Sequence, residues 1–323
     1  IYRIPEQEAL AERLCQLSGL SRAFFCNSGA EANEAAIKIA RLHGHNNGVE
    51  SPAIVVMEKS FHGRTMATLS ATGNRKVQAG FEPLVSGFVR VPFGDSAAVE
   101  ALAAHHKNIV AVLVEPYQGE GGVQIPQADY LVELRRICDA QGWLLMLDEV
   151  QTGVARTGTW FAFQHTNVLP DVMTLAKGLG SGVPIGACLA RGVAAETFTP
   201  GKHGSTFGGG PLACTAALTT LAVMESDGLL ANANRLGEYI RSDLAARLHG
   251  LAGVVEIRGQ GLMIGIQLDR PCGDLVKMAL AEKMLINVTN DTVVRLLPPL
   301  VLTQADAELL TEKLARLIRT FLG

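Results

Sequence analysis

The feature that most constrains the fold is a series of short apolar runs, bounded by turn residues and separated by segments with helical periodicity. The helical segments include Glu31–Leu42 and Tyr130–Ala140. The expected strands are Ala53–Met57, Gly87–Val91, Ile109–Val114, Trp143–Leu147, Val172–Ala176 and Ile185–Ala190. Strands that alternate with helices predict an α/β fold with a mainly parallel sheet covered on both faces.

The second half of the chain has a different pattern. A long stretch rich in Ala and Leu is interrupted at Asp227-Gly228, and two strand-like runs follow, Val254–Arg258 and Met263–Leu268. We therefore predict a large domain, residues 1–229, and a smaller C-terminal α+β domain, residues 230–323.

Composition limits the class of protein. The 323 residues are enough for about two domains. The net charge of −3 gives no electrostatic argument for binding nucleic acid or an acidic membrane. No apolar run approaches membrane-spanning length, and six cysteines without a C-x-x-C pair predict reduced thiols in a cytoplasmic protein. The chain opens in what looks like an amphipathic helix, Ile4–Leu17, without a methionine, so we expect a natural N-terminal segment to precede it.

Two ionisable residues follow apolar runs directly. Asp148 comes after Trp143–Leu147, and Lys177 comes after Val172–Ala176. Ligands of open parallel sheets bind beyond the carboxyl ends of the strands, so an acid and an amine placed there can share one site. Pyridoxal phosphate requires both, because a lysine condenses with its aldehyde and an acid keeps its ring nitrogen protonated. The pair therefore suggests an enzyme that moves an amino group.

Each of the two residues also has a simpler interpretation. Asp148 can be a turn former or a helix cap, and Lys177 can be an ordinary surface lysine. The apolar residues before Lys177 and the glycines after it favour a partly buried lysine, which loses its charge more readily.

Other loops carry candidate binding groups. Asn27–Asn33 opens a helix whose free N–H groups suit a phosphate, although Ser28 and Glu31 also have the spacing of a capping box. In Ser60–Thr65 an aromatic side chain can cover a flat ring and an arginine can grip a carboxylate, or both can be ordinary loop residues. Within that loop, His62 is expected to be a hydrogen-bonded loop residue rather than a catalytic base.

Three further stretches are of the same kind. Glu115–Gly122 places two acids in a glycine-rich loop, and His203–Gly209 offers two hydroxyls for a phosphate or forms a hinge. Arg295 is a candidate carboxylate clamp or a member of a structural ion pair. No metal site is expected, because the histidine pairs lack further ligands. The glycine patterns of nucleotide-binding loops are absent as well.

Taken together, these stretches resemble the class III, or omega-, aminotransferases, which use pyridoxal phosphate on the fold type I scaffold. The ordered series spans nearly the whole chain: Asn27–Asn33, Ser60–Thr65, Glu115–Gly122, Leu147–Gly153, Leu175–Gly178, His203–Gly209 and Arg295–Leu300. The resemblance implies a mainly parallel large domain with a smaller C-terminal α+β domain.

The resemblance also implies roles around the cofactor ring. Lys177 would hold the cofactor covalently and shuttle the proton. Asp148 would pair with the pyridinium nitrogen, and Gln151 would contact the ring hydroxyl. Phe61 would stack on one face of the ring and Val150 on the other.

At the phosphate, Gly29 and Ala30 would offer backbone N–H groups. Thr206 would reach the phosphate of the neighbouring subunit, which implies a homodimer with shared active sites. Arg64 and Ser205 would contact the amine substrate.

For the acceptor, Arg295 would bind a carboxylate of the 2-oxo acid, and Glu120 would neutralise this arginine when the other substrate enters. Within the family the chain is most similar to members that transfer the terminal amine of N2-acetyl-L-ornithine to 2-oxoglutarate in arginine biosynthesis. Succinylornithine, ornithine and other omega-amines remain alternative substrates. An aminomutase of the same fold and a non-catalytic binding protein also remain open, and a nicotinamide-dependent oxidoreductase is a distant alternative.

Overall fold

The computed structural model describes residues 2–323, which form two compact units. Unit 1 consists of the described residues within Ile1–Pro116, together with Pro126–Val154 and Trp160–Val223. Unit 2 consists of Tyr117–Ile125, Ala155–Thr159 and Met224–Gly323. The sequence-based division between residues 229 and 230 stays a prediction.

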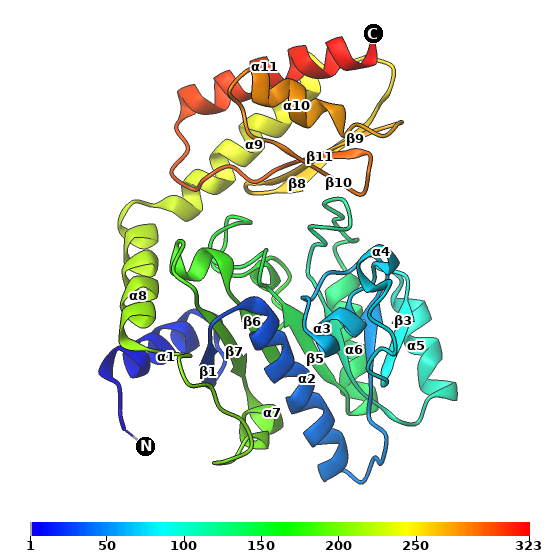
Figure 1. Ribbon diagram of the computed structural model, residues 1–323, viewed down its shortest axis with the longest axis vertical. Helices are drawn as coiled ribbons and strands as arrows, with labels where there is room; N and C mark the ends of the chain where they lie inside the picture. The colour runs from blue at the N-terminus through cyan, green and yellow to red at the C-terminus, as the bar shows by residue number, and fades with distance from the viewer. Residues whose placement is uncertain (1) are drawn as a thin grey trace. The chain divides into compact units, whose positions relative to one another are not determined.

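Unit 1 is built on a seven-stranded sheet. Its strands are β1 (Arg22–Cys26), β2 (Ala53–Met57), β3 (Phe88–Val91), β4 (Ile109–Val114), β5 (Leu144–Asp148), β6 (Val172–Leu175) and β7 (Gly186–Ala190). They lie in the order β1-β7-β6-β5-β4-β2-β3. Figure 1 labels β1, β7, β6, β5 and β3 of this sheet. The pairs from β3 to β6 are parallel, and β7 runs antiparallel to both β6 and β1. The predicted α/β fold with a mainly parallel sheet is therefore confirmed.

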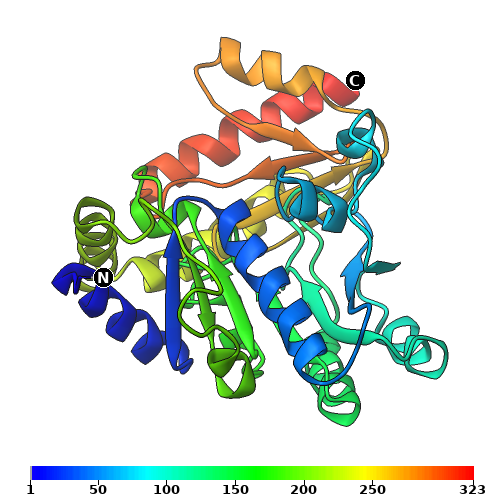
Figure 2. The ribbon, with the colours of Figure 1, turned by 60° about the horizontal axis from the view of Figure 1, so that its bottom comes forward.

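Helices cover both faces of this sheet (Figure 2). They are α1 (Pro5–Ser18), α2 (Gly29–Asn46), α3 (Met66–Ala71), α4 (Arg75–Gln78), α5 (Ser96–His105), α6 (Tyr130–Gln141) and α7 (Gly192–Thr197), with short 3-10 turns η1 (Ala162–His165) and η2 (Lys177–Gly180). On one face, Ile37 of α2 packs in the cluster that contains Val56 and Met146. On the other face, Tyr130 of α6 donates its hydroxyl to Met57 Sδ at 3.3 Å. Because neighbouring strand residues face opposite sides, the sheet is buried between α2 and α6.

Unit 2 contains an antiparallel sheet packed on helices. The strands are β8 (Val254–Gln260), β9 (Met263–Leu268), β10 (Asn287–Thr289) and β11 (Val293–Leu296), in the order β10-β11-β9-β8. The helices are α9 (Leu229–Arg247), α10 (Asp274–Ala281) and α11 (Gln304–Leu322). Leu236 and Leu244 of α9 share one apolar core with Leu314 and Ile318 of α11 and with Ile264 of β9.

The predicted helix interruption at Asp227-Gly228 is confirmed. Helix α8 (Pro211–Ser226) ends just before it, and α9 begins just after it. Gly228 has a left-handed backbone at φ 64°, a conformation that glycine adopts at no steric cost. All six cysteines are free thiols. Among residues 2–323, the structure contains no helix with the length and apolar character needed to cross a membrane.

Candidate active site

Asp148 and Lys177 lie at the same edge of the unit 1 sheet. Asp148 is the last residue of β5 and pairs in register with Thr174 of the parallel strand β6. Lys177 follows β6 after one residue and begins η2. The prediction had placed Asp148 just beyond its strand, whereas β5 runs one residue further. Adjacent parallel strands thus deliver the carboxylate and the amine to one edge.

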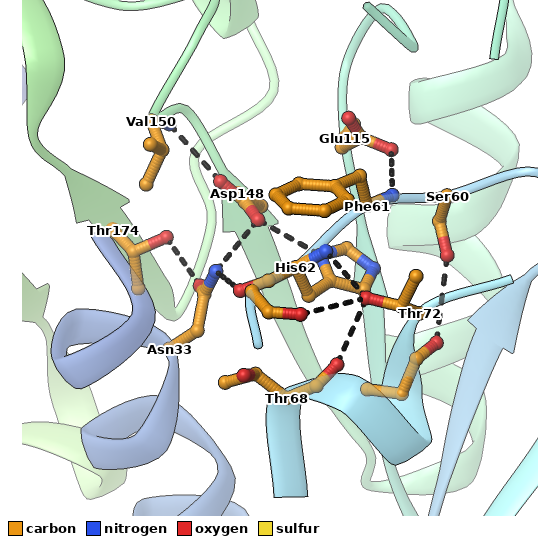
Figure 3. Close-up of polar contacts among 12 residues, drawn as sticks. Asn33, Ser60, Phe61, His62, Thr68, Thr72, Glu115, Asp148, Val150 and Thr174 are labelled. Carbon is orange, nitrogen blue, oxygen red and sulfur yellow. Dashed lines mark hydrogen bonds and ion pairs between the residues drawn. The ribbon is translucent and has the colours of Figure 1, made fainter. Parts of the chain in front are cut away.

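The carboxylate of Asp148 is buried and held by three donors (Figure 3). Asn33 Nδ2 donates to Oδ2 at 2.7 Å, and His62 Nδ1 lies 2.8 Å from the same oxygen. The backbone N–H of Val150 donates to Oδ1 at 3.0 Å. Since a carboxylate has about four acceptor positions, one position on Oδ1 remains available within the described residues.

Asn33 is the centre of this network, and the sequence analysis gave it no role. Its Nδ2 also donates to the His62 backbone oxygen at 2.8 Å, while its Oδ1 accepts from the Thr174 hydroxyl at 2.7 Å. All of these groups are buried. A signal was present in the sequence, because Asn33 lies four residues after Gly29 and therefore on the same helix face.

His62 is a fully hydrogen-bonded loop residue on its Nδ1 side, in agreement with its interpretation from sequence. A carboxylate oxygen accepts, so the 2.8 Å contact corresponds to an Nδ1–H that donates to Asp148 Oδ2. The His62 backbone N–H donates to Thr72 Oγ1 at 3.0 Å, and that hydroxyl donates to the Thr68 carbonyl at 2.9 Å. The loop before α3 therefore fixes the imidazole against Asp148.

The start of α2 combines a cap with free amides. Ser28 Oγ accepts from the N–H of Glu31 at 3.2 Å, and Glu31 Oε2 accepts from the N–H of Asn27 at 2.8 Å. Ser28 therefore caps α2 as the spacing predicted, but the capping box is incomplete, because Glu31 accepts from Asn27 and not from Ser28. The N–H groups of Gly29 and Ala30 have no acceptor within residues 2–323, so the helix end can also receive an anion.

Gly29 packs closely against Val150. A Cβ atom built at Gly29 would lie 2.7 Å from Val150 Cγ1, closer than real side chains approach. Glycine is therefore required where the start of α2 meets the turn after β5. The structure thus brings together Gly29 and Val150, which are both predicted to contact the cofactor.

Lys177 differs from its expected environment. Lys177 is exposed rather than partly buried. Its backbone has a φ of 43°, in the left-handed region that non-glycine residues rarely adopt. The expectation of a partly buried lysine is wrong for this chain.

Phe61 and Arg64 lie on the loop after β2. Phe61 is half-buried, and its backbone N–H donates to Glu115 Oε2 at 3.2 Å. Arg64 is exposed, with its Cζ 5.9 Å from the centroid of the Phe61 ring. Gln151 is half-buried in the turn after β5.

The loop that contains Ser205 and Thr206 is exposed. Ser205 Oγ accepts from the N–H of Gly208 at 3.0 Å and from Asn27 Nδ2 at 3.3 Å. These bonds tie the loop to the residue that precedes the helix cap of α2. The hydroxyl of Ser205 thereby lies beside the amino end of α2.

Glu149 is a buried acid that the sequence analysis did not single out. Its Oε2 accepts from the Thr152 hydroxyl at 2.6 Å and from the N–H of Ala162 at 2.9 Å, and Oε1 accepts from the N–H of Phe163 at 2.9 Å. Burial raises the pKa of this carboxyl to about 7, against the opposing effect of the three donors. Glu149 thus joins the turn after β5, which carries Val150, to the backbone of η1.

Glu120 and Arg295 both belong to unit 2, where they form an ion pair. Arg295 Nη1 donates to Glu120 Oε1 at 2.7 Å. The Arg295 side chain is 9% exposed, whereas that of Glu120 is 41% exposed. The predicted pairing of these two residues is therefore present within the unit.

Comparison with known proteins decides the family. The profile of the family described as aminotransferase class-III matches residues 1–318. The protein is a class-III aminotransferase. This aminotransferase is 63% identical to the acetylornithine aminotransferase of Nitrosomonas europaea over 100% of this chain and 82% of the relative.

Solved structures of relatives have the same fold as this aminotransferase. An ornithine aminotransferase from Toxoplasma gondii, with partial occupancy of PLP at its active site, matches with a TM-score of 0.94 and 33% identity. That match covers 99% of this chain and 77% of the other. Acetylornithine aminotransferase from Elizabethkingia anophelis matches with a TM-score of 0.86 and 32% identity, over 99% of this chain and 80% of the other. The predicted fold type I architecture is therefore confirmed.

Proposed function

We propose that this aminotransferase uses pyridoxal phosphate to transfer the terminal amine of N2-acetyl-L-ornithine to 2-oxoglutarate. The observation that carries the substrate is the 63% identity, over the whole chain, to a relative named acetylornithine aminotransferase. The placement of Asp148 and Lys177 at one sheet edge supports the cofactor.

The residues at this edge fit the cofactor chemically. Asp148 is a buried acid whose donors are an amide, an imidazole and a backbone N–H, and it keeps an acceptor position for a protonated ring nitrogen. The free amides of Gly29 and Ala30 suit a phosphate dianion at the positive end of the α2 dipole. Phe61 and Val150 would cover the two faces of the ring, and Gln151 would contact its hydroxyl.

A protonated pyridine ring supplies an electron sink for the substrate carbon that loses its proton. Asp148 keeps that nitrogen protonated, because a buried carboxylate favours a positive charge beside it. Lys177 would hold the cofactor covalently until the amine of the substrate replaces it, and its released Nζ would then move the proton between two positions of the substrate.

The ion pair in unit 2 supports two substrates of different charge. Arg295 would bind a carboxylate of 2-oxoglutarate bidentately. When acetylornithine enters instead, Glu120 would pair with Arg295, because an arginine buried to this degree is costly without a counter-charge. Arg64 and Ser205 would contact acetylornithine.

We also propose a cytoplasmic homodimer with shared active sites. The loop around Thr206 is exposed, and the neighbouring apolar side chains of Phe207 and Leu212 are 81% and 79% exposed. Large apolar side chains grouped on a surface are typical of a protein interface. A second copy of the chain would cover them and receive Thr206 at its phosphate site.

Ornithine is the second candidate amine donor, because a solved ornithine aminotransferase shares the fold at a TM-score of 0.94. Turnover of acetylornithine, succinylornithine, ornithine and 4-aminobutyrate with 2-oxoglutarate tests the assignment. We expect the highest kcat/KM for acetylornithine, and a strong preference for another donor would overturn the substrate. Product formation without any 2-oxo acid would indicate an aminomutase.

A further inference from the structure

Arg295 has a second acceptor besides Glu120. In the hairpin of β10 and β11, Asn287 lies directly opposite Arg295. Facing residues of antiparallel strands project their side chains from the same face of the sheet. Arg295 Nη2 donates to Asn287 Oδ1 at 3.1 Å, while Nη1 donates to Glu120 at 2.7 Å. Two nitrogens of one rigid guanidinium plane are thus held by a neutral and a charged acceptor.

The backbone around Glu120 is fixed independently of its side chain. The Thr289 hydroxyl donates to the Glu120 carbonyl. Arg258 donates to the carbonyls of Gly122 and Val123 at 2.6 and 2.8 Å. The Glu120 side chain remains 41% exposed. Its carboxylate can therefore leave the guanidinium by side-chain rotation into solvent while the loop stays in place.

We infer that Asn287 is a positioning residue that keeps the Arg295 guanidinium oriented for the carboxylate of the 2-oxo acid while Glu120 is turned away. This inference rests on the proposed alternation of substrates at Arg295. An amide oxygen carries no net charge, so it orients the guanidinium without cancelling the charge that attracts the substrate. A group held in its bound orientation loses less conformational entropy when the ligand arrives. Asn287 should therefore favour the dicarboxylate half of the reaction specifically.

The test separates the two half-reactions with three variants. For Asn287→Ala we expect KM for 2-oxoglutarate to rise about 5- to 20-fold, since a hydrogen bond to a charged group is lost at a partly exposed site. For Asn287→Asp we expect a rise of at least about 30-fold, because a permanent carboxylate would pair with Arg295 and repel the substrate. Asn287→Gln should restore part of the affinity.

The amine half-reaction provides the contrast. In all three variants the rate with acetylornithine as donor should stay within about twofold of wild type, because Glu120 neutralises Arg295 at that stage. The control is Leu285→Asp, which adds the same charge two residues earlier at an 87% exposed position. This control should leave KM for 2-oxoglutarate within about twofold of wild type. Equal changes in both half-reactions, or no change in either, would overturn the inference.

A binding measurement separates this inference from the proposed function. Calorimetric titration of the cofactor-loaded protein with glutarate, an unreactive dicarboxylate, should give a Kd that is about 5- to 20-fold weaker for Asn287→Ala. If the wild-type protein fails to use acetylornithine but Asn287→Ala binds glutarate more weakly than wild type does, the amine substrate is wrong and the role of Asn287 stands. If wild type turns over acetylornithine and glutarate binds equally to both proteins, the role of Asn287 is wrong.

Discussion

The hydrogen-bonded network around the Asp148 carboxylate and the ion pair between Glu120 and Arg295 differ in burial and in the number of their hydrogen bonds. Asp148, Asn33, His62 and Thr174 are all buried and joined by several hydrogen bonds of normal length. The Glu120 side chain is 41% exposed, and its Oε1 pairs with Arg295 Nη1 at 2.7 Å.

The difference matches what each region has to do. A group that keeps a single partner through a reaction gains from a buried network, because low dielectric strengthens every bond in it. A group that changes partner must not be bound too tightly, and the Glu120 carboxylate is 41% exposed, so water can solvate it when it leaves Arg295. The group that keeps its partners, Asp148, and the group that changes partner, Glu120, thus belong to different units of the chain.

The largest expected effect comes from removing the amine of Lys177, which follows the strand next to that of Asp148. Lys177→Ala should lower transaminase turnover at least about 10³-fold, because both the covalent attachment and the proton transfer are lost. Steady-state assays with acetylornithine and 2-oxoglutarate measure this. Lys107→Ala, at an exposed lysine that precedes β4, is the matched control and should retain full activity. Wild-type turnover by Lys177→Ala would exclude the proposed role.

The buried region should respond to pH through Glu149. Its folded pKa is raised from 4.5 to about 7, so its protonated form is the one stabilised by folding. The stabilisation is complete below about pH 4.5 and is lost as pH rises through 7, a change of about 3 kcal/mol in the free energy of unfolding. Urea unfolding across this window should show that slope in wild type and in the exposed control Glu12→Gln. A Glu149→Gln variant with the same slope as wild type would contradict the assignment.

Removing the centre of the network should destabilise the fold. Asn33→Ala leaves the Thr174 hydroxyl, the His62 carbonyl and one Asp148 oxygen each short of a partner, which costs about 2 to 3 kcal/mol of unfolding free energy. Asn47→Ala makes the same change at the other end of α2 and should cost about 1 kcal/mol or less. Equal losses in the two variants, measured by urea unfolding, would mean that the network does not stabilise this region.

The smallest effect is expected at Glu120, the exposed member of the ion pair in unit 2. Glu120→Ala should slow the acetylornithine half-reaction about 5- to 10-fold and leave the 2-oxoglutarate half-reaction unchanged or slightly faster. Asp269→Ala breaks an ion pair of unit 2 that is exposed on both sides, the one with Arg270, and serves as the control. Stopped-flow measurements of the two half-reactions decide the outcome. A loss of the 2-oxoglutarate half-reaction alone would refute the gating role of Glu120.

The apolar pattern predicted the strands that are buried in the middle of the sheet. Ala53–Met57 and Ile109–Val114 match β2 and β4 residue for residue, because each is a continuous apolar run with turns at both ends. The edge strand β1 was missed although four of its five residues are apolar, and β10 and β11 were missed because they are only three and four residues long and include polar residues. The reversed direction of β7 was not predicted either, because an apolar run is the same in both directions.

The site shows a similar limit. Asp148 and Lys177 were found because residues at strand ends meet at one edge of a parallel sheet. Asn33 and Thr174 were not found, since their roles depend on which side chains meet between α2 and β6. Asn287 required the register of a hairpin that was itself not predicted.

The left-handed backbone at Lys177 lowers the thermal stability of the protein at the residue on which the proposed activity depends. A residue with a Cβ atom at a φ of 43° costs about 1 kcal/mol relative to glycine. Lys177→Gly should therefore outlast Lys177→Ala during heating by a few degrees, even though both are inert as enzymes. A more heat-resistant protein is thus one substitution away, and the lysine that blocks it is the residue on which the proposed chemistry depends.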